Sequence, residues 1–247
     1  MDNTRILSAE RPSPFPMALA ALAAVALSVA LGIVFFATPN EATMGIVQKI
    51  FYFHVPSAMA AYAGFIICGV ASVYYLVTGN VRGDIVARSA AELGVLFCAA
   101  VLLSGPLWAK KAWGTYWTGE PRLLLTLVTA LIFVAYLVVR SVGGRNEMTR
   151  KICAVLGILG VANIPLVRMS VNKWRGNHPQ VVTGGGDGIA EQMVPAFASM
   201  SLAILLVFAA LFVMRMHIGY AREDAETWHR LVSRRRDAMR DLAPNAT

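Results

Sequence analysis

Long uninterrupted apolar runs, separated by short polar segments, dominate the pattern of this 247-residue chain. A membrane-spanning helix needs about 20 mainly apolar residues, with a usual range of about 17–25. Six runs come close to or reach this length with no charged residue, or with one near an end: Met17–Ala37, Val55–Val77, Ser89–Leu107, Leu123–Val139, Ile152–Val167 and Met193–Met214. The pattern therefore predicts six transmembrane helices.

The runs favour helices over membrane strands. In lipid each backbone group must pair within its own segment, so a continuous apolar run becomes a helix. Strands of a membrane barrel would alternate apolar and polar residues, and these runs do not. The fifth run is the shortest and contains Asn163 and Pro165. The composition agrees with a membrane protein, because 15% of the residues are charged, against about 25% in a soluble domain. We predict an all-α, polytopic membrane protein, a bundle of six transmembrane helices.

Lysine and arginine predict the orientation of the bundle. With six spans both termini share a side, and 15 of the 22 Lys and Arg residues fall on that side. The positive side is cytoplasmic, so both termini are predicted to be cytoplasmic. The net charge of +8 is then mainly a topology signal, and no nucleic-acid binding is predicted.

This topology divides the chain into three parts. Residues 1–16 form a cytoplasmic lead, residues 17–214 the membrane domain, and residues 215–247 a basic cytoplasmic tail. Within the membrane domain, the connections 38–54, 106–122 and 170–192 lie on the non-cytoplasmic side. Apolar residues at helical spacing among the arginines of the tail predict a helix on anionic lipid, or alternatively a helix that docks a partner.

The connection 106–122 gathers aromatic side chains. Trp108, Trp113, Tyr116 and Trp117 fall within ten positions. Enrichment of tryptophan at membrane interfaces explains one or two such residues in a loop. Large rigid rings also supply stacking area at low entropic cost, so the cluster favours a platform for a ligand, with interfacial anchoring as the alternative.

Two histidines, His54 and His178, fall in the other two connections on the same side. A single interfacial histidine is usually only a polar tip. Two imidazoles beside flat aromatic surface favour a site for a flat, iron-containing ring, since imidazole is a common axial ligand of haem. A zinc site is less well supported, because no third His or Cys lies on that face.

Cations surround the aromatic cluster: Lys110, Lys111 and Arg122 flank it, and Arg168 and Lys173 approach it from the fifth span. Ordinary interfacial snorkelling would explain them. The functional alternative is pairing with carboxylates such as haem propionates, which arginine binds through two parallel hydrogen bonds. All three cysteines fall inside predicted spans and are interpreted as small packing residues.

Several motifs together resemble those of haem exporter protein C, the CcmC family. His54-Val55-Pro56 opens the second span, and Trp113-Gly-Thr-Tyr-Trp117, followed by Pro121-Arg122-Leu123, is similar to the family's tryptophan-rich loop. Asn163-Ile-Pro165 and the series Ser170, Trp174 and His178 are similar to its fifth span and third outer loop. The resemblance covers nearly the whole chain.

The resemblance implies a role in c-type cytochrome biogenesis at the bacterial inner membrane. It implies that haem b is bound transiently and without a covalent bond at the periplasmic face, and is then passed to a membrane-anchored haem chaperone. The implied partners also include the ABC transporter subunits of the system and a small single-span membrane subunit. Since haem is held and passed on rather than transformed, no enzyme activity is expected.

Residue by residue, the resemblance implies that His54 and His178 are the two axial ligands of the haem iron. The tryptophan-rich loop would then cradle the edge of the ring and contact the chaperone. The predicted haem-binding residues are His54, His178, Trp108, Trp113, Tyr116, Trp117, Glu120 and Arg122.

The chain departs from the family pattern at Gly119-Glu120, where the family has Trp-Asp, and at Leu124-Leu125, where it has Thr-Ser. Glu120 keeps the negative charge on a side chain longer by one methylene group. Gly119 removes an aromatic wall, which bears on the affinity for haem or on the fit to the chaperone.

Three alternative functions are weighed against haem delivery. A solute permease would place polar or charged groups near the middle of the membrane, whereas these spans are almost free of charge. A synthase that attaches haem to apocytochrome c is related through the tryptophan-rich loop, but such chains are typically larger. A b-type electron-transfer subunit would carry histidines inside its spans, and the predicted spans contain none.

Overall fold

Six long helices build the computed structural model, which describes residues 14–174, 178–179 and 189–242. Each is long and apolar enough to cross a membrane, which confirms the predicted all-α fold with six spans. The helices are α1 (Phe15–Gly32, continued by a π-helical turn, Ile33–Ala37), α2 (Phe51–Thr78), α3 (Val81–Trp113), α4 (Pro121–Val142), α5 (Glu147–Lys173) and α6 (Val194–Leu242).

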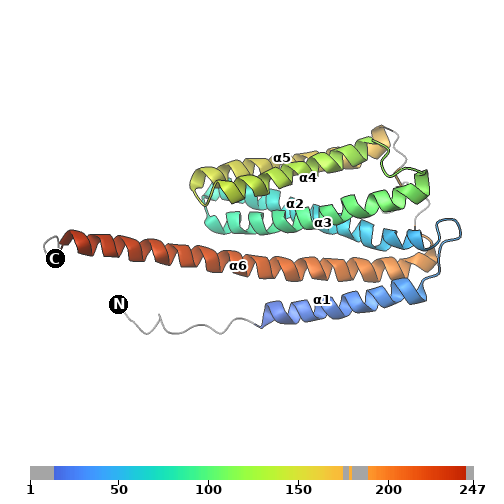
Figure 1. Cartoon of the computed structure of the whole chain (residues 1–247), viewed down its shortest axis with the longest axis horizontal. Coiled ribbons are helices and arrows are strands. Elements are labelled where there is room, and N and C mark those ends of the chain that lie inside the picture. Colours follow the sequence, from blue (N-terminus) through green and yellow to red (C-terminus); the bar gives the residue numbers. More distant parts are fainter. Residues whose placement is uncertain (1–13, 175–177, 180–188, 243–247) are drawn as a thin grey trace.

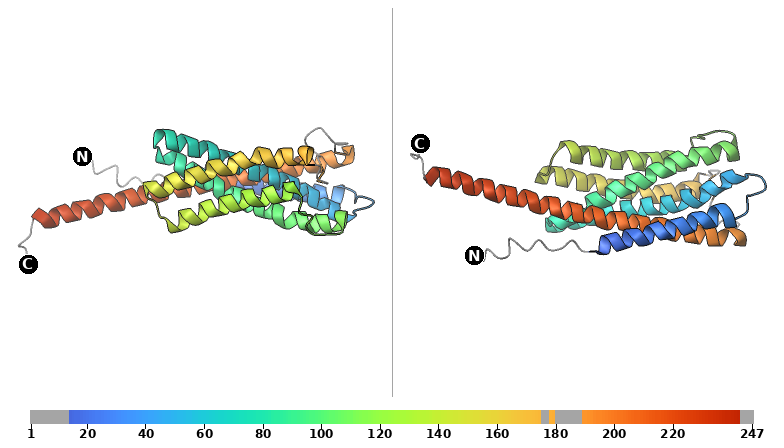
Figure 2. Two further views of the ribbon diagram at one scale, coloured as in Figure 1. Left: turned by 90° about the horizontal axis from the view of Figure 1, so that it is seen from above. Right: turned by 60° about the horizontal axis from the view of Figure 1, so that its bottom comes forward.

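The helices run roughly parallel to one long axis (Figure 1). The pair α2 and α3 lies in the middle, with the pair α4 and α5 on one side and α6, covered by α1, on the other (Figures 1 and 2). The α1–α2 and α3–α4 connections, the last turn of α5 and the first turn of α6 all lie at one end (Figure 1). This end is called the site end below, and the other is called the opposite end.

Glycine lets α2 and α3 approach closely in the middle of the bundle. A Cβ atom on Gly64 would lie 2.8 Å from the carbonyl oxygen of Ala90 and 2.9 Å from Cα of Gly94. Beside this contact, Phe65 stacks on Phe133 of α4 with ring centroids 4.0 Å apart. Small residues at a helix interface are the usual route to close packing in lipid, and here they bring the site-end turns of α2 and α3 together.

The fifth span is tied to the fourth by the asparagine inside its apolar run. The amide nitrogen of Asn163 donates to the backbone oxygen of Leu125 at 2.9 Å and to the hydroxyl of Thr129 at 2.8 Å. A polar group that would otherwise be costly in lipid therefore forms an interhelical contact.

Several helices are longer than the apolar runs that predict them. Helix α3 begins after Asn80, whose side chain accepts a hydrogen bond from the backbone N–H of Arg82, and it ends at Gly114, which has φ +76°. Trp108 and Trp113 therefore lie on α3. The sequence had placed them in the connection between the third and fourth spans. In the same way α2 begins at Phe51, so His54 is within its first turn and not in the preceding connection.

Helix α6 extends into the predicted tail. It continues without a break from its apolar span to Leu242 and projects beyond the rest of the bundle (Figures 1 and 2). The described part of the tail is thus a helix that continues the sixth span and not a separate element, and its binding to anionic lipid or to a partner stays a prediction. The first 13 residues of the predicted lead and residues 175–177 and 180–188 of the third outer connection lie outside the described residues.

Candidate functional site

A cavity of about 630 Å³ lies at the site end, lined by residues of α2, α3, α4 and α5 and of the adjoining connections. Sites for small molecules and cofactors usually measure about 300–1,000 Å³. The wall contains seven of the eight predicted site residues: His54, His178, Trp108, Trp113, Tyr116, Trp117 and Arg122. Three outer connections that are far apart in the sequence thus contribute to one cavity.

His54 is held by two neighbouring residues of α3. The hydroxyl of Ser104 donates to the backbone oxygen of Ala100 at 2.7 Å, and this uses its only hydrogen. The same hydroxyl oxygen lies 2.9 Å from Nδ1 of His54, so it accepts the Nδ1 proton. The other ring nitrogen, Nε2, then keeps its lone pair and can ligate a metal.

Gly105 leaves room for the ring of His54. A Cβ atom built on Gly105 would lie 3.1 Å from Cε1 of His54, which is closer than ordinary van der Waals contact. Position 105 on α3 therefore decides how near α3 the imidazole can lie.

His178 has a similar arrangement in the third outer connection. Its Nδ1 lies 3.2 Å from the backbone oxygen of Pro179, and a carbonyl oxygen can only accept. Nδ1 therefore carries the proton, and Nε2 keeps its lone pair. Burial, with the positive charge of Arg122 second, lowers the pKa of the His178 imidazole to about 4. The ring is thus neutral near pH 7, the state in which imidazole binds a metal.

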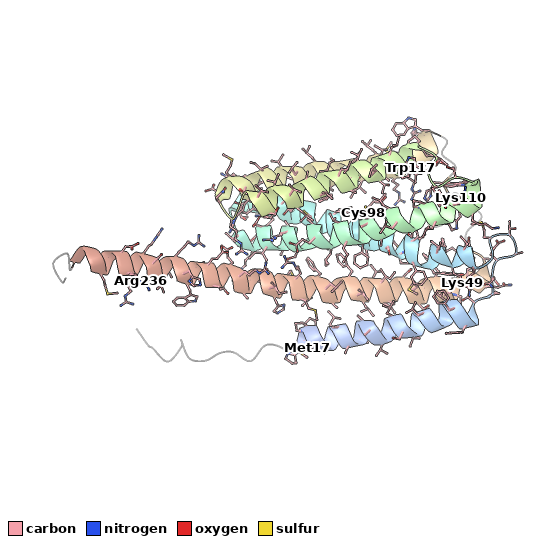
Figure 3. The ribbon with its side chains drawn as sticks, in the orientation of Figure 1. Met17, Lys49, Cys98, Lys110, Trp117 and Arg236 are labelled. Carbon is pink, nitrogen blue, oxygen red and sulfur yellow. The ribbon has the colours of Figure 1, made fainter. Side chains whose placement is uncertain are left out.

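The tryptophans form one wall of the cavity and its rim. Trp108 and Trp113 meet edge to face with ring centroids 5.4 Å apart, and the indole N–H of Trp108 donates to Gln48 at 3.2 Å. Trp113 also contacts the ring of His178, at 6.4 Å between centroids. Trp117 lies in the α3–α4 connection, near Lys110 at the site end (Figure 3), and is 39% exposed. The inner two indoles are thus fixed by contacts, and the outer one faces the surroundings.

Two guanidinium groups face the cavity, Arg122 at the start of α4 and Arg168 near the end of α5. Lys110 and Lys111 are not part of its wall. Lys110 donates to the backbone oxygen of Gly114 at 2.9 Å and lies over the ring of Tyr116. The structure therefore favours Arg122 and Arg168 over the two lysines as partners for carboxylates of a ligand.

Glu120, the eighth predicted site residue, does not line the cavity, and its role stays a prediction. Both of its carboxylate oxygens are buried, and neither has a hydrogen-bond partner among the described residues. Its neighbour Gly119 has φ +70°, a conformation that L side chains rarely adopt. The glycine at position 119 therefore suits this backbone conformation, which a tryptophan there would rarely adopt.

Sequence reasoning missed Ser104, Gly105 and Gln48, the residues that position His54 and Trp108. The available signal was weak: a Ser-Gly pair at the end of an apolar run, and a glutamine six residues before His54. Neither pattern identifies a neighbour on another helix.

Fold and site together define a polytopic helical membrane protein with a cavity at one end that aromatic rings, two imidazoles and two guanidinium groups line. The chain belongs to the heme exporter protein C family (CcmC), whose model matches residues 7–230. It is 30% identical to the heme exporter protein C of Bradyrhizobium diazoefficiens over 198 residues, which cover 78% of this chain and 75% of that protein.

Two further relatives cover a similar share. A putative cytochrome c biosynthesis ccmC-like mitochondrial protein of Marchantia polymorpha is 28% identical over 76% of this chain and 77% of its own length. The heme exporter protein C of Escherichia coli K12 is 27% identical over 72% of both chains.

Proposed function

We propose that this protein binds haem at the periplasmic face of the bacterial inner membrane and delivers it to a haem chaperone during c-type cytochrome biogenesis. The observation that carries the proposal is the site-end cavity, whose wall contains both His54 and His178 together with the tryptophans. Membership of the heme exporter protein C family supports the same function.

The residues around the cavity fit haem as a transient, non-covalent cargo. Haem iron takes imidazole nitrogen as an axial ligand, and the hydrogen bonds of His54 and His178 leave Nε2 of each ring free to ligate. Haem propionates are carboxylates, which guanidinium groups bind strongly. Arg122 and Arg168 supply two such groups at the cavity wall.

Delivery is proposed to occur at the rim of the cavity. Tyr116 and Trp117 are 56% and 39% exposed and offer a partner rigid aromatic surface, which is enriched in protein interfaces. A chaperone docked there would displace one or both imidazoles as haem leaves. The ABC transporter subunits and a small single-span subunit of the same system complete the proposed set of partners.

The periplasmic location of the cavity is supported by the positive-inside rule. The site end carries the smaller share of the lysines and arginines, and the opposite end carries the larger share. In bacterial membrane proteins the more positive side faces the cytoplasm.

Transfer from the purified protein tests this proposal. The full chain in detergent is loaded with haem and mixed with the soluble domain of a haem chaperone, and the haem content of each protein is measured after separation. We expect Trp117→Ala to slow transfer while haem stays bound. Trp174→Ala is the matched control, because Trp174 is exposed and does not line the cavity. Failure of the unmodified protein to transfer haem would contradict the proposed delivery.

A further inference from the structure

A second, smaller pocket lies at the opposite end of the bundle, between α3, α4, α5 and α6. Its volume is about 30 Å³, and one water molecule needs roughly 10–15 Å³ on the same measure. The pocket therefore has space for about two water-sized groups, such as two oxygens of a larger anion. Six arginines line it: Arg88, Arg140, Arg145, Arg150, Arg215 and Arg222.

The positive charge around this pocket exceeds the negative charge. Asp84 and Glu223 are the two acidic residues of its wall. Glu92 pairs with Arg88 and Arg215, and Glu226 pairs with Arg145. Even with these two carboxylates counted, six arginines face four acidic groups. A pocket wall with an excess of one sign of charge concentrates counter-ions, so the excess favours an anion.

Two of the arginines are buried and have a nitrogen without an acceptor. Arg140 is 5% exposed and bonds both oxygens of Asp84, one of them at 3.1 Å. Arg150 is 6% exposed and donates to both oxygens of Glu223, at 3.0 and 3.1 Å. Within the described residues, Nε of Arg140 and Nη1 of Arg150 find no hydrogen-bond partner. Buried donors of this kind are rare in native proteins unless an ion or water satisfies them.

Helix α6 brings a third guanidinium group to the mouth of the pocket. Gly219 lies so close to α3 that a Cβ atom there would be 2.6 Å from Cγ2 of Ile85. This close approach places Arg222, one turn further along α6, at the pocket. Arg222 is exposed, and no described carboxylate lies within salt-bridge distance of it.

We infer that this pocket binds a phosphate group. Arg140, Arg150 and Arg222 belong to α4, α5 and α6, so their guanidinium groups reach the pocket wall from separate helices, and the tetrahedral oxygens of a phosphate can meet more than one of them. A planar carboxylate presents only two oxygens. The lining residues flank the apolar runs of α3, α4, α5 and α6, so they are expected near lipid headgroups. The phosphate can therefore belong to an anionic lipid or to a free phosphate-bearing solute.

Two binding measurements on the full chain test this inference and separate the two sources. Native mass spectrometry of the detergent-purified protein measures retention of phosphatidylglycerol, and thermal unfolding measures stabilisation by inorganic phosphate. We expect Arg222→Gln to weaken binding of the phosphate source about tenfold, the effect of losing one charge-assisted hydrogen bond.

Arg234→Gln is the matched control, because it removes the same charge from an exposed position on α6 outside the pocket. Lipid retention that depends on Arg222 but not on Arg234 would identify a headgroup as the ligand. Stabilisation by inorganic phosphate with the same dependence, without lipid retention, would identify a free solute. Equal losses in the Arg222 and Arg234 variants, or no response to either probe, would overturn the inference.

Discussion

At the scale of single residues, the candidate haem site depends on how its two histidines are held. Nε2 of each ring is free because a neighbouring oxygen accepts the proton on Nδ1. This oxygen belongs to Ser104 for His54 and to Pro179 for His178. The sequence identified the histidines because family motifs and a shared side of the membrane single them out. It could not identify Ser104, since the contact depends on how close α2 and α3 lie.

Ser104→Ala tests the hydrogen bond to His54. Loss of the acceptor leaves the imidazole free to rotate or to change its protonated nitrogen, so we expect haem affinity to fall about tenfold or more, the usual effect of removing a partner that orients a metal ligand. Haem titration followed by absorbance measures it. Ser141→Ala is the control, because its hydroxyl bonds the backbone of α4 near the opposite end. Equal affinity in the Ser104 variant and the unmodified protein would refute the positioning role.

Gly105→Ala tests the space beside the same ring. The added methyl group would lie 3.1 Å from Cε1 of His54, so the imidazole must shift and the low-spin fraction of bound haem should fall. Gly32→Ala is the matched control, since a Cβ atom on this helical glycine meets no atom within 4 Å. Identical spectra for the two variants would show that Gly105 does not shape the site.

At the scale of the helices, hydropathy predicted the number of spans but not where they end. A run of apolar residues reports the part of a helix in lipid, whereas backbone hydrogen bonds continue until a cap stops them. Helix α3 therefore extends from its cap at Asn80 to the left-handed Gly114, well past its apolar run at both ends. This extension places Trp108 and Trp113 on a rigid helix, which suits a preformed binding wall.

A buried ion-pair network at the opposite end joins α3, α4, α5 and α6. Asp84 pairs with Arg140 and lies 3.7 Å from Arg150, which also binds Glu223 of α6. Asp84→Asn would leave two buried guanidinium groups short of a counter-charge, and breaking such a pair typically costs about 3–5 kcal/mol. We expect a clearly lower unfolding temperature in detergent.

The control for this network is Glu147→Gln. Glu147 pairs with Lys151 on the exposed surface of α5, and an exposed pair contributes little, so the unfolding temperature should not change. If the Asp84 variant were as stable as this control, the network would not hold the opposite end together.

At the scale of the whole molecule, the site-end cavity and the arginine-lined pocket lie at opposite ends of the bundle. The sequence predicted this separation, because His54, His178 and the tryptophans of connection 106–122 fall in connections that alternate with those that hold most of the arginines. Which end faces the periplasm stays a prediction from the positive-inside rule.

Single introduced cysteines test the orientation. All three native cysteines are buried, so background labelling should be low. Thr118→Cys at the site end should react with a membrane-impermeant thiol reagent in intact cells with a permeabilised outer membrane. Ser141→Cys, exposed near the opposite end, should react only after lysis. The reverse labelling pattern would show that the topology is inverted and that the cavity faces the cytoplasm.

The most direct test of the central claim is the absorption spectrum of the detergent-purified protein from haem-replete cells, beside His54→Ala and His178→Ala. We expect a low-spin haem spectrum in the unmodified protein and, in each variant, lost haem or a change to high spin. A low-spin spectrum that survives both substitutions would contradict the two-histidine site. Absence of haem from every sample, including protein purified with its chaperone, would contradict haem binding itself.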